Sequence, residues 1–215
     1  MNERIVAAAI HGRYLTIPPE TSGPAPVFVG FHGYAEDAEE QLERLRVIPG
    51  SSLWLCVSIQ GLHRFYQRRT EKVVASWMTR QHRELAIADN IAFVSACIES
   101  AAAEWPTTAS TVFAGFSQGV GMAFRAAVSS TRRVAGVIAV GGDIPPEIGS
   151  EALGRVSTAL VARGISDPWY SREKFAEDQR RLREASVTVD AIEFDGGHEW
   201  SGQVIEAAGH FLRNL

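Results

Sequence analysis

A serine flanked by two glycines lies between an apolar run and an Ala-rich run that is compatible with a helix. The motif is Gly115-Phe116-Ser117-Gln118-Gly119, with residues 112–114 before it and residues 122–128 after it. The spacing Gly-x-Ser-x-Gly is typical of a sharp strand-to-helix turn that lifts a serine hydroxyl clear of a sheet. Side chains at the glycine positions would meet neighbouring backbone, and the helix N-terminus would favour negative charge beside the serine. Ser117 is therefore a candidate nucleophile, although the motif alone also fits an ordinary glycine-rich turn.

A serine hydroxyl needs an adjacent base at neutral pH, and after a turn of this kind an acid and then a histidine follow along the chain. His198 stands in the loop after the last predicted strand, where Gly196 and Gly197 allow the backbone to turn the imidazole toward Ser117. We expect His198 to be the base. Four other histidines fit less well and are expected to be solvated or packed: His11, His63, His82 and His210.

The acid must orient the imidazole and stabilise its protonated form. Asp167 is expected in this role because it follows the strand before the one that leads to His198. Asp143 also follows a predicted strand and remains a second option. Asp195 is only three residues before His198, and Asp190 lies within a predicted strand, so both are less well placed. An Asp-Pro turn that only shapes the loop is the structural alternative for Asp167.

Negative charge develops on the carbonyl oxygen during acyl transfer, so backbone donors must face it. The N–H of Gln118, directly after the candidate nucleophile, is one expected donor. The other is expected from the loop after the first buried strand, His32-Gly33-Tyr34, where the Tyr34 N–H fits best. We expect His32 to brace this loop rather than to act as a base.

Strand and helix patterns alternate after residue 27, and the candidate residues His32-Gly33-Tyr34, Ser117, Asp167 and His198 each follow a strand pattern. Strand patterns cover residues 27–31, 53–59, 112–116, 134–140, 158–162 and 187–194. Residues 27–31 and 53–59 are the apolar runs expected of strands buried on both faces, whereas residues 187–194 alternate loosely. Helical patterns cover residues 38–48, 84–104, 122–128, 171–184 and 201–212. The alternation predicts an α/β fold with a mostly parallel sheet, helices on both faces, and a ligand site beyond the carboxyl ends of the strands. Residues Ile5–Ile10 and Tyr14–Ile17 predict an N-terminal antiparallel hairpin that turns at Gly12.

Length and composition fit one soluble domain over residues 1–215. The chain is 46% hydrophobic and 21% charged, without repeats or an interdomain linker. Its net charge of −4 gives no electrostatic reason to expect nucleic acid as a partner. No segment is expected to reach the length of a transmembrane helix, and the N-terminal residues lack a secretory pattern, so we expect a cytoplasmic protein without stable membrane insertion. Cys56 and Cys97 lie in apolar segments and are expected to be buried free thiols.

Four pieces in chain order resemble the phospholipase/carboxylesterase family of small α/β-hydrolases, which includes acyl-protein thioesterases and bacterial carboxylesterases. They are His32-Gly33, Gly115-Phe116-Ser117-Gln118-Gly119, Gly164-x-x-Asp167 and Gly197-His198-Glu199. The resemblance covers nearly the whole chain from residue 27 onward. It implies an α/β-hydrolase fold without a large cap domain, and esterase or thioesterase activity with Ser117, Asp167 and His198 as a catalytic triad.

The chain departs from the family pattern beside the expected site. Ala35 stands where a glycine often follows the His-Gly pair, Arg163 replaces a common histidine, and Pro168-Trp169-Tyr170 replaces small aliphatic residues. These departures leave the chemistry alone but bear on the substrate. Trp169 and Tyr170 are expected to crowd the mouth of the site, and Trp77-Met78 to add a second apolar wall. Core packing is the alternative for all four side chains.

The expected function is a serine hydrolase that acts on a small-molecule ester or acyl substrate through an acyl-enzyme, with no cofactor and no metal. The same residues could cleave a lysophospholipid or a peptide, and a non-catalytic hydrolase-like binding protein is the alternative from another class. Residues 62–83 carry six basic side chains and one acidic one, which predicts either a lid that attracts anions or a solvated lid. By analogy with the fold, apolar edge elements could support a homodimer.

Overall fold

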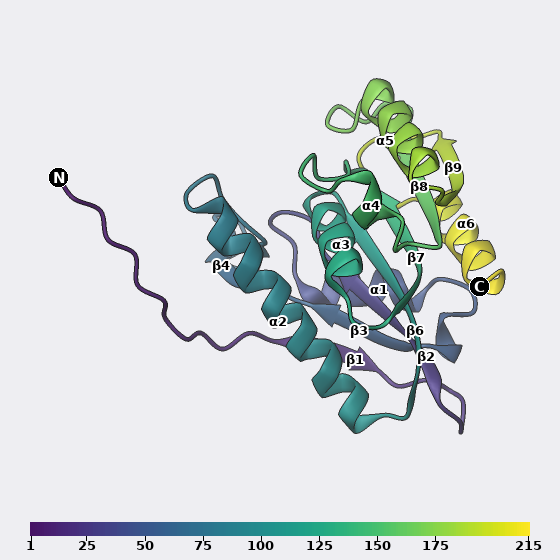
Figure 1. The fold of residues 1–215 in the computed structure, drawn as a ribbon, viewed down its shortest axis with the longest axis horizontal. Coiled ribbons are helices and arrows are strands. Elements are labelled where there is room, and N and C mark those ends of the chain that lie inside the picture. The colour runs from purple at the N-terminus through teal and green to yellow at the C-terminus, as the bar shows by residue number, and fades with distance from the viewer.

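The computed structural model covers residues 1–215 and contains a seven-stranded sheet with helices on both faces (Figure 1). The strand order is β1-β3-β2-β6-β7-β8-β9. Only β1 runs antiparallel to its neighbour, which confirms the expected mostly parallel sheet. The strands are β1 Tyr14–Ile17, β2 Ala25–Phe31, β3 Leu55–Ile59, β6 Thr107–Phe116, β7 Arg133–Val140, β8 Thr158–Gly164 and β9 Thr188–Phe194.

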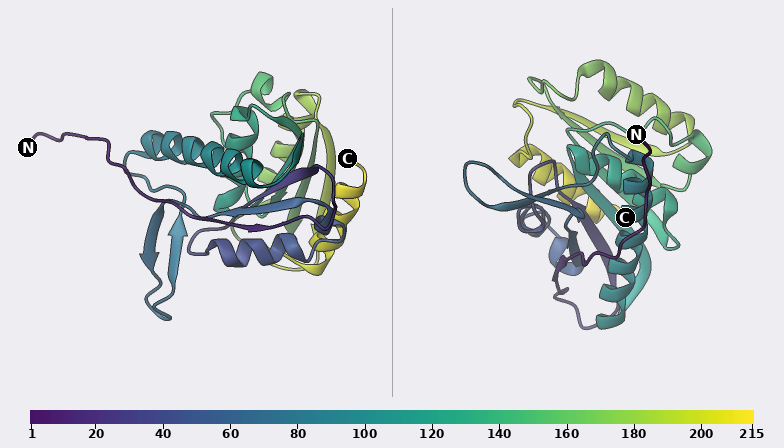
Figure 2. Two further views of the ribbon diagram at one scale, coloured as in Figure 1. Left: turned by 90° about the horizontal axis from the view of Figure 1, so that it is seen from below. Right: turned by 90° about the vertical axis from the view of Figure 1, so that its left-hand side faces the viewer.

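Helices cover the two faces of the sheet and bury the two sets of alternating strand residues (Figure 2). Helices α1 (Ala38–Arg46) and α6 (Gly202–Arg213) pack on one face. Helices α2 (Arg83–Glu104), α3 (Gln118–Ser129) and α5 (Arg172–Glu184) pack on the other. Two short elements, a 3-10 turn at Ser51–Leu53 and α4 at Ser150–Leu153, lie in the connecting segments. This two-sided packing explains why the central strands β2, β3 and β7 are almost continuously apolar, whereas the edge strand β9 alternates polar and apolar residues.

The N-terminal antiparallel pairing is present, but residues 5–10 do not take part in it. β1 pairs with β3, whereas residues 5–10 form no strand and extend from the body as an exposed segment (Figure 1). Gly12 does not form the expected hairpin turn. A Cβ atom at Gly12 would lie 2.2 Å from the Phe93 ring, so this glycine instead permits close approach to α2.

The basic segment, residues 62–83, contains a separate hairpin of β4 (His63–Tyr66) and β5 (Val73–Ser76), which projects from the body in Figure 2. The outer edge of β5 is joined to the loop after β2, because Ala35 N–H donates to the Ala75 carbonyl at 3.0 Å and Ala75 N–H donates to the Glu36 carbonyl at 2.8 Å. The basic segment is thereby tied to the loop that begins with His32.

Helix α2 is long and apolar enough to cross a membrane by length and composition alone, so the expectation that no segment reaches that length was wrong. Core helices of soluble proteins can have the same length and apolar composition. In this structure Val94, Cys97 and Ile98 of α2 lie in the larger core cluster. Cys97 and Cys56 are buried free thiols, as expected, and burial raises the pKa of each to about 12.

Candidate active site

Ser117 lies on a strained turn between β6 and α3. Its φ angle is 52°, in the region that side chains rarely occupy. A Cβ atom at Gly115 would lie 2.4 Å from the Gly119 carbonyl oxygen, and one at Gly119 would lie 2.1 Å from the Phe31 carbonyl oxygen. Both glycines are therefore required for β6 and α3 to meet at this angle beside the end of β2.

The structure brings Ser117, His198 and Asp167 together at the carboxyl ends of three strands. The Ser117 Oγ lies 2.8 Å from His198 Nε2, and His198 Nδ1 lies 2.8 Å from Asp167 Oδ2. The Asp167 side chain is 1% exposed and that of His198 is 20% exposed. This geometry allows a proton to pass from the serine hydroxyl to the imidazole while a desolvated carboxylate faces the opposite nitrogen.

The second oxygen of Asp167 is held by the backbone of its own loop. Asp167 Oδ1 accepts hydrogen bonds from the N–H groups of Trp169 at 2.8 Å and Tyr170 at 3.0 Å. Asp143, the alternative acid, is instead half exposed and pairs with Lys174 at 3.5 Å. None of the other candidate carboxylates forms a hydrogen bond with His198.

His32 braces the loop after β2, as expected from the sequence. The Gly61 N–H donates to His32 Nε2 at 3.0 Å, so Nδ1 carries the proton and donates to the Gly33 carbonyl at 2.7 Å. Burial lowers the pKa of His32 below its ordinary value, which favours the neutral imidazole. Trp77 stacks on this ring at 5.0 Å and its indole N–H donates to the His32 carbonyl at 2.8 Å.

The backbone N–H groups of Gln118, directly after Ser117, and of Tyr34, which lines the same cavity as Ser117, form no hydrogen bond within the protein. The Gln118 side chain fixes the strand-to-helix turn at Ser117, called the elbow below, to the residues after β5. Its Oε1 accepts from the Trp77 N–H at 3.0 Å and its Nε2 donates to the Met78 carbonyl at 3.2 Å. Hydrogen bonds therefore hold the backbone near both free N–H groups: those of the Gln118 side chain, and the bond from the Ala35 N–H to the Ala75 carbonyl next to Tyr34.

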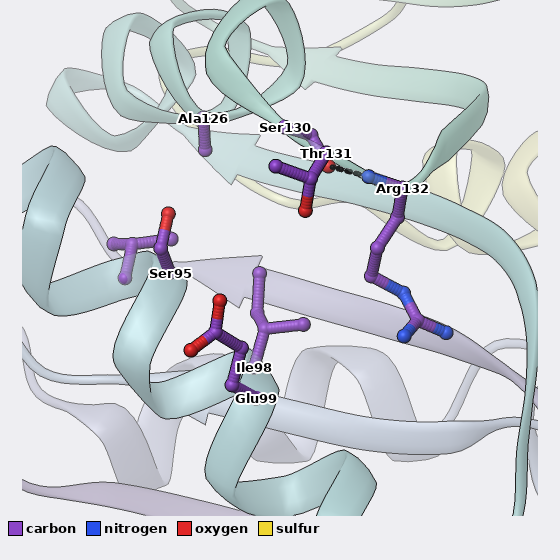
Figure 3. A pocket seen from close by; sticks show the side chains of 8 residues that line it. Ser95, Ile98, Glu99, Ala126, Ser130, Thr131 and Arg132 are labelled. Atoms are coloured by element: carbon purple, nitrogen blue, oxygen red, sulfur yellow. Dashed lines mark hydrogen bonds between the residues drawn. The ribbon is translucent and has the colours of Figure 1, made fainter.

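A cavity of about 390 Å³ opens over Ser117 and is lined by Tyr34, Ser117, Trp169 and His198. Trp169 is 72% exposed and Tyr34 is 61% exposed, so aromatic side chains form the rim. Another cavity, of about 100 Å³, lies between α2 and the far end of α3 and contains Glu99 and Arg132 (Figure 3). None of its lining residues is one of the predicted site residues, whereas Ser117 and His198 both line the cavity over Ser117.

Three of the four predicted pocket residues do not line this cavity. Trp77 is fully buried against His32, and Tyr170 is 1% exposed, with its hydroxyl donating to Asp178 Oδ2 at 2.8 Å. Both are core residues because each ring finds a polar partner for its N–H or O–H group inside the protein. Met78 is half-buried and its sulfur lies 3.8 Å from Arg125 Nη1. Only Trp169 stands where the sequence placed it.

Sequence reasoning missed a charged pair that links the loop after β2 to the elbow. Glu36 Oε2 accepts from the Gly33 N–H at 2.7 Å, and both Glu36 oxygens accept from Arg44 at 2.6 and 2.7 Å. The Arg44 guanidinium lies 4.4 Å from the Phe116 ring centroid, and that ring lies 5.0 Å from the His198 ring. Burial alone would raise the pKa of Glu36, but the hydrogen bond and charge of Arg44 outweigh it and lower that pKa.

A mostly parallel sheet, a serine on a strained strand–helix turn and a histidine after the last strand together define the chain as an α/β-hydrolase. The family model for Phospholipase/Carboxylesterase matches residues 73–215, well over half of the chain. The chain belongs to this family, and it is an esterase-type hydrolase. The search of curated proteins found no significant match.

Solved structures show the same fold at low sequence identity. Esterase PE8 has a TM-score of 0.73 at 17% identity, over 96% of this chain and 100% of that one. The Bacillus cereus carboxylesterase has a TM-score of 0.72 at 17% identity, over 94% of each chain. The Zea mays acyl-protein thioesterase 2 has a TM-score of 0.71 at 15% identity, over 95% of this chain and 99% of that one.

Proposed function

We propose that the protein hydrolyses carboxylic esters or thioesters through an acyl-enzyme formed on Ser117. The observation that carries this proposal is the pair of 2.8 Å contacts that connect Ser117 to His198 and His198 to Asp167. Membership of a phospholipase/carboxylesterase family supports the same reaction class. The solved relatives include proteins described as a carboxylesterase and an acyl-protein thioesterase, which favours an ester or thioester over an amide.

In the proposed reaction, Ser117 Oγ attacks the carbonyl carbon while its proton passes to His198 Nε2. Asp167 stabilises the imidazolium and keeps the imidazole oriented. The tetrahedral oxyanion faces the free N–H groups of Tyr34 and Gln118, where each donor lowers the barrier by roughly 3 kcal/mol. Collapse expels the alcohol or thiol, which takes the proton from His198. A water molecule then attacks the acyl-enzyme by the same steps and releases the acid and free Ser117.

The cavity indicates which substrates fit the proposed reaction. Its volume of about 390 Å³ and its exposed rim of Tyr34 and Trp169 suit a small or solvent-exposed acyl group. The two aromatic faces can pack against apolar parts of a substrate. Comparison of kcat/KM for matched ester, thioester, amide and lysophospholipid substrates will rank these classes.

Active-site labelling with a fluorophosphonate, read by intact mass, tests the proposal. We expect one adduct on the wild type, none on Ser117→Ala, and strongly slowed labelling of His198→Ala and Asp167→Asn. Ser130→Ala, at the far end of α3, is the matched serine control and should label normally. Absence of an adduct on folded wild type would refute the acyl-enzyme, and normal labelling of Asp167→Asn would refute the assigned acid.

A further inference from the structure

The position of the proposed acid depends on the backbone of its loop, residues 165–170. Asp167 Oδ1 is held by two N–H groups from the second half of this loop. The first half is tied to the β9 end, because Ile165 N–H donates to the Phe194 carbonyl and Ser166 N–H donates to the Gly196 carbonyl, both at 2.9 Å. A shift of the second half would therefore move one oxygen of Asp167 and turn the other away from His198.

One buried guanidinium reaches both ends of this loop. Arg163 Nε donates to the Tyr170 carbonyl at 2.8 Å, and Arg163 Nη2 donates to the Ile165 carbonyl at 3.1 Å. The third contact, from Nη1 to Glu193 Oε1 at 2.6 Å, neutralises the charge. Glu193 is the residue paired with Arg163 in the β8–β9 register, so the sheet itself sets the place of the guanidinium.

We propose that Arg163 is a positioning residue for the reaction: it clamps residues 165 and 170 so that Asp167 keeps one oxygen on His198. This inference rests on the proposed function, in which Asp167 is the acid. The planar guanidinium presents donors in fixed directions and can hold two carbonyls and a carboxylate at once. A lysine or a histidine at this position could satisfy the charge or one carbonyl, but neither could hold both ends of the loop.

The test measures kcat and KM separately for Arg163→Met, Arg163→Lys and Glu193→Gln. We expect Arg163→Met to lower kcat by about 10- to 100-fold with KM within twofold, because displacement of a reacting group by about 1 Å has effects of this size. Arg163→Lys should lose most of the same activity although it keeps the ion pair. Glu193→Gln should stay within about threefold of the wild type, because both bonds to the loop remain.

Arg132→Met is the matched control for a general loss of stability. Arg132 is a partly buried arginine that donates to neutral oxygens, with Nε 2.9 Å from Thr111 Oγ1, but it lies near the opposite end of β6 from Ser117. We expect it to lower the melting temperature without lowering kcat below the melting range. An equal fall of kcat in Arg132→Met and in folded Arg163→Lys would overturn the proposal.

A double-mutant cycle with Asp167→Asn separates this inference from the proposed function. Asp167→Asn should lower kcat by about 10³- to 10⁴-fold, and adding Arg163→Met should lower it by less than about threefold further, because Arg163 acts through Asp167. Full additivity would overturn the positioning role while leaving the acid in place. Unchanged kcat in Asp167→Asn would instead overturn the acid assignment, and the positioning role with it.

Discussion

Asp167 and Trp169 lie two residues apart in one loop, yet their side chains differ in solvent exposure and in the contacts they make. The Asp167 side chain is 1% exposed and accepts three hydrogen bonds, whereas Trp169 is 72% exposed and its indole packs against no aromatic neighbour. The same contrast separates the floor of the cavity, formed by Ser117 and His198 with Asp167 buried behind the imidazole, from its rim, formed by Tyr34 and Trp169.

The contrast indicates where this chain can change without loss of chemistry. The floor is held by strand ends, by glycines in close contact and by buried charged groups, so its geometry depends on many residues at once. The rim side chains have few restraints, so substitutions there should alter substrate preference more than the rate of bond cleavage. Changes to the floor should lower kcat, and changes to the rim should alter KM.

The largest effect on stability and kcat is expected at Gly164, where the end of β8 meets the loop that carries His198. A Cβ atom at Gly164 would lie 2.1 Å from the Gly197 carbonyl oxygen, so Gly164→Ala must displace the loop that carries His198. We expect it to destabilise the fold by about 3 kcal/mol and to lower kcat more than about 100-fold. Gly197→Ala is the control, because a Cβ atom there meets nothing within 4 Å. Chemical denaturation and steady-state kinetics measure both effects, and equal behaviour of the two variants would contradict the close-contact argument.

A pH-dependent effect on the free energy of unfolding is expected at Asp178, which contacts the buried Tyr170 hydroxyl. This residue accepts from the Tyr170 hydroxyl and from the Ile144 N–H at 3.1 Å, and burial raises its pKa from 3.8 to about 6. The folded protein therefore keeps a proton that the unfolded chain releases, so the free energy of unfolding falls as pH rises between about 4 and 6. The fall amounts to about 3 kcal/mol and should be missing in Asp178→Asn.

Urea denaturation of both proteins at several pH values between 4 and 7 measures this difference. Parallel stability curves for the wild type and Asp178→Asn would show that the Asp178 carboxyl is not perturbed. Tyr170→Phe is a useful control, because it removes one partner of Asp178 and leaves the carboxyl in place.

A smaller effect is expected at the link between the loop after β2 and the elbow. Arg44→Met removes the partner of Glu36 and the cation over Phe116. We expect a loss of about 1–3 kcal/mol, below the figure for fully buried pairs because both side chains are 19% exposed, and a several-fold fall in kcat. Arg46→Met is the control, since its pair with Glu43 lies on the exposed side of the same helix. Equal melting temperatures for the two variants would argue against a structural role for the link.

At the rim, Trp169→Ala should change specificity rather than chemistry. Removal of the indole should raise KM for esters with apolar acyl chains by about threefold to tenfold, equivalent to roughly 1 kcal/mol of aromatic contact, with kcat within twofold. Tyr66→Ala is the control, because Tyr66 is equally exposed but lies on the β4–β5 hairpin away from the lining of the cavity. A large fall in kcat for Trp169→Ala would place this residue with the floor instead.

The smallest effect is expected for the salt dependence of kcat/KM and concerns the β4–β5 hairpin. Arg68 and Arg69 are exposed near the β4–β5 turn, and neither forms an ion pair. If they attract anionic substrates, raising salt from low to physiological strength should lower kcat/KM for an anionic ester by about twofold to threefold and leave a matched neutral ester unchanged. The double variant Arg68→Gln/Arg69→Gln should lose this salt dependence. An equal salt effect on both esters would identify the hairpin as a solvated surface.

The sequence by itself determined the elbow and the chain order of the polar residues. Gly115 and Gly119 encode a local backbone shape. Ser117, Asp167 and His198 each follow an apolar run, which places them at one edge of a parallel sheet. These features could be predicted because they depend on neighbours in the chain and on the alternation of strands and helices.

Only the tertiary structure placed Asp167 rather than Asp143 against His198. It also buried the side chains of Trp77 and Tyr170, and it paired β4 with β5. Each of these outcomes depends on contacts between segments far apart in the sequence, such as Ala35 with Ala75 or Trp77 with His32. An aromatic or basic residue has the same local pattern whether it faces a cavity or the core. Its burial is set by the elements that pack against it, and no spacing along the chain records which elements those are.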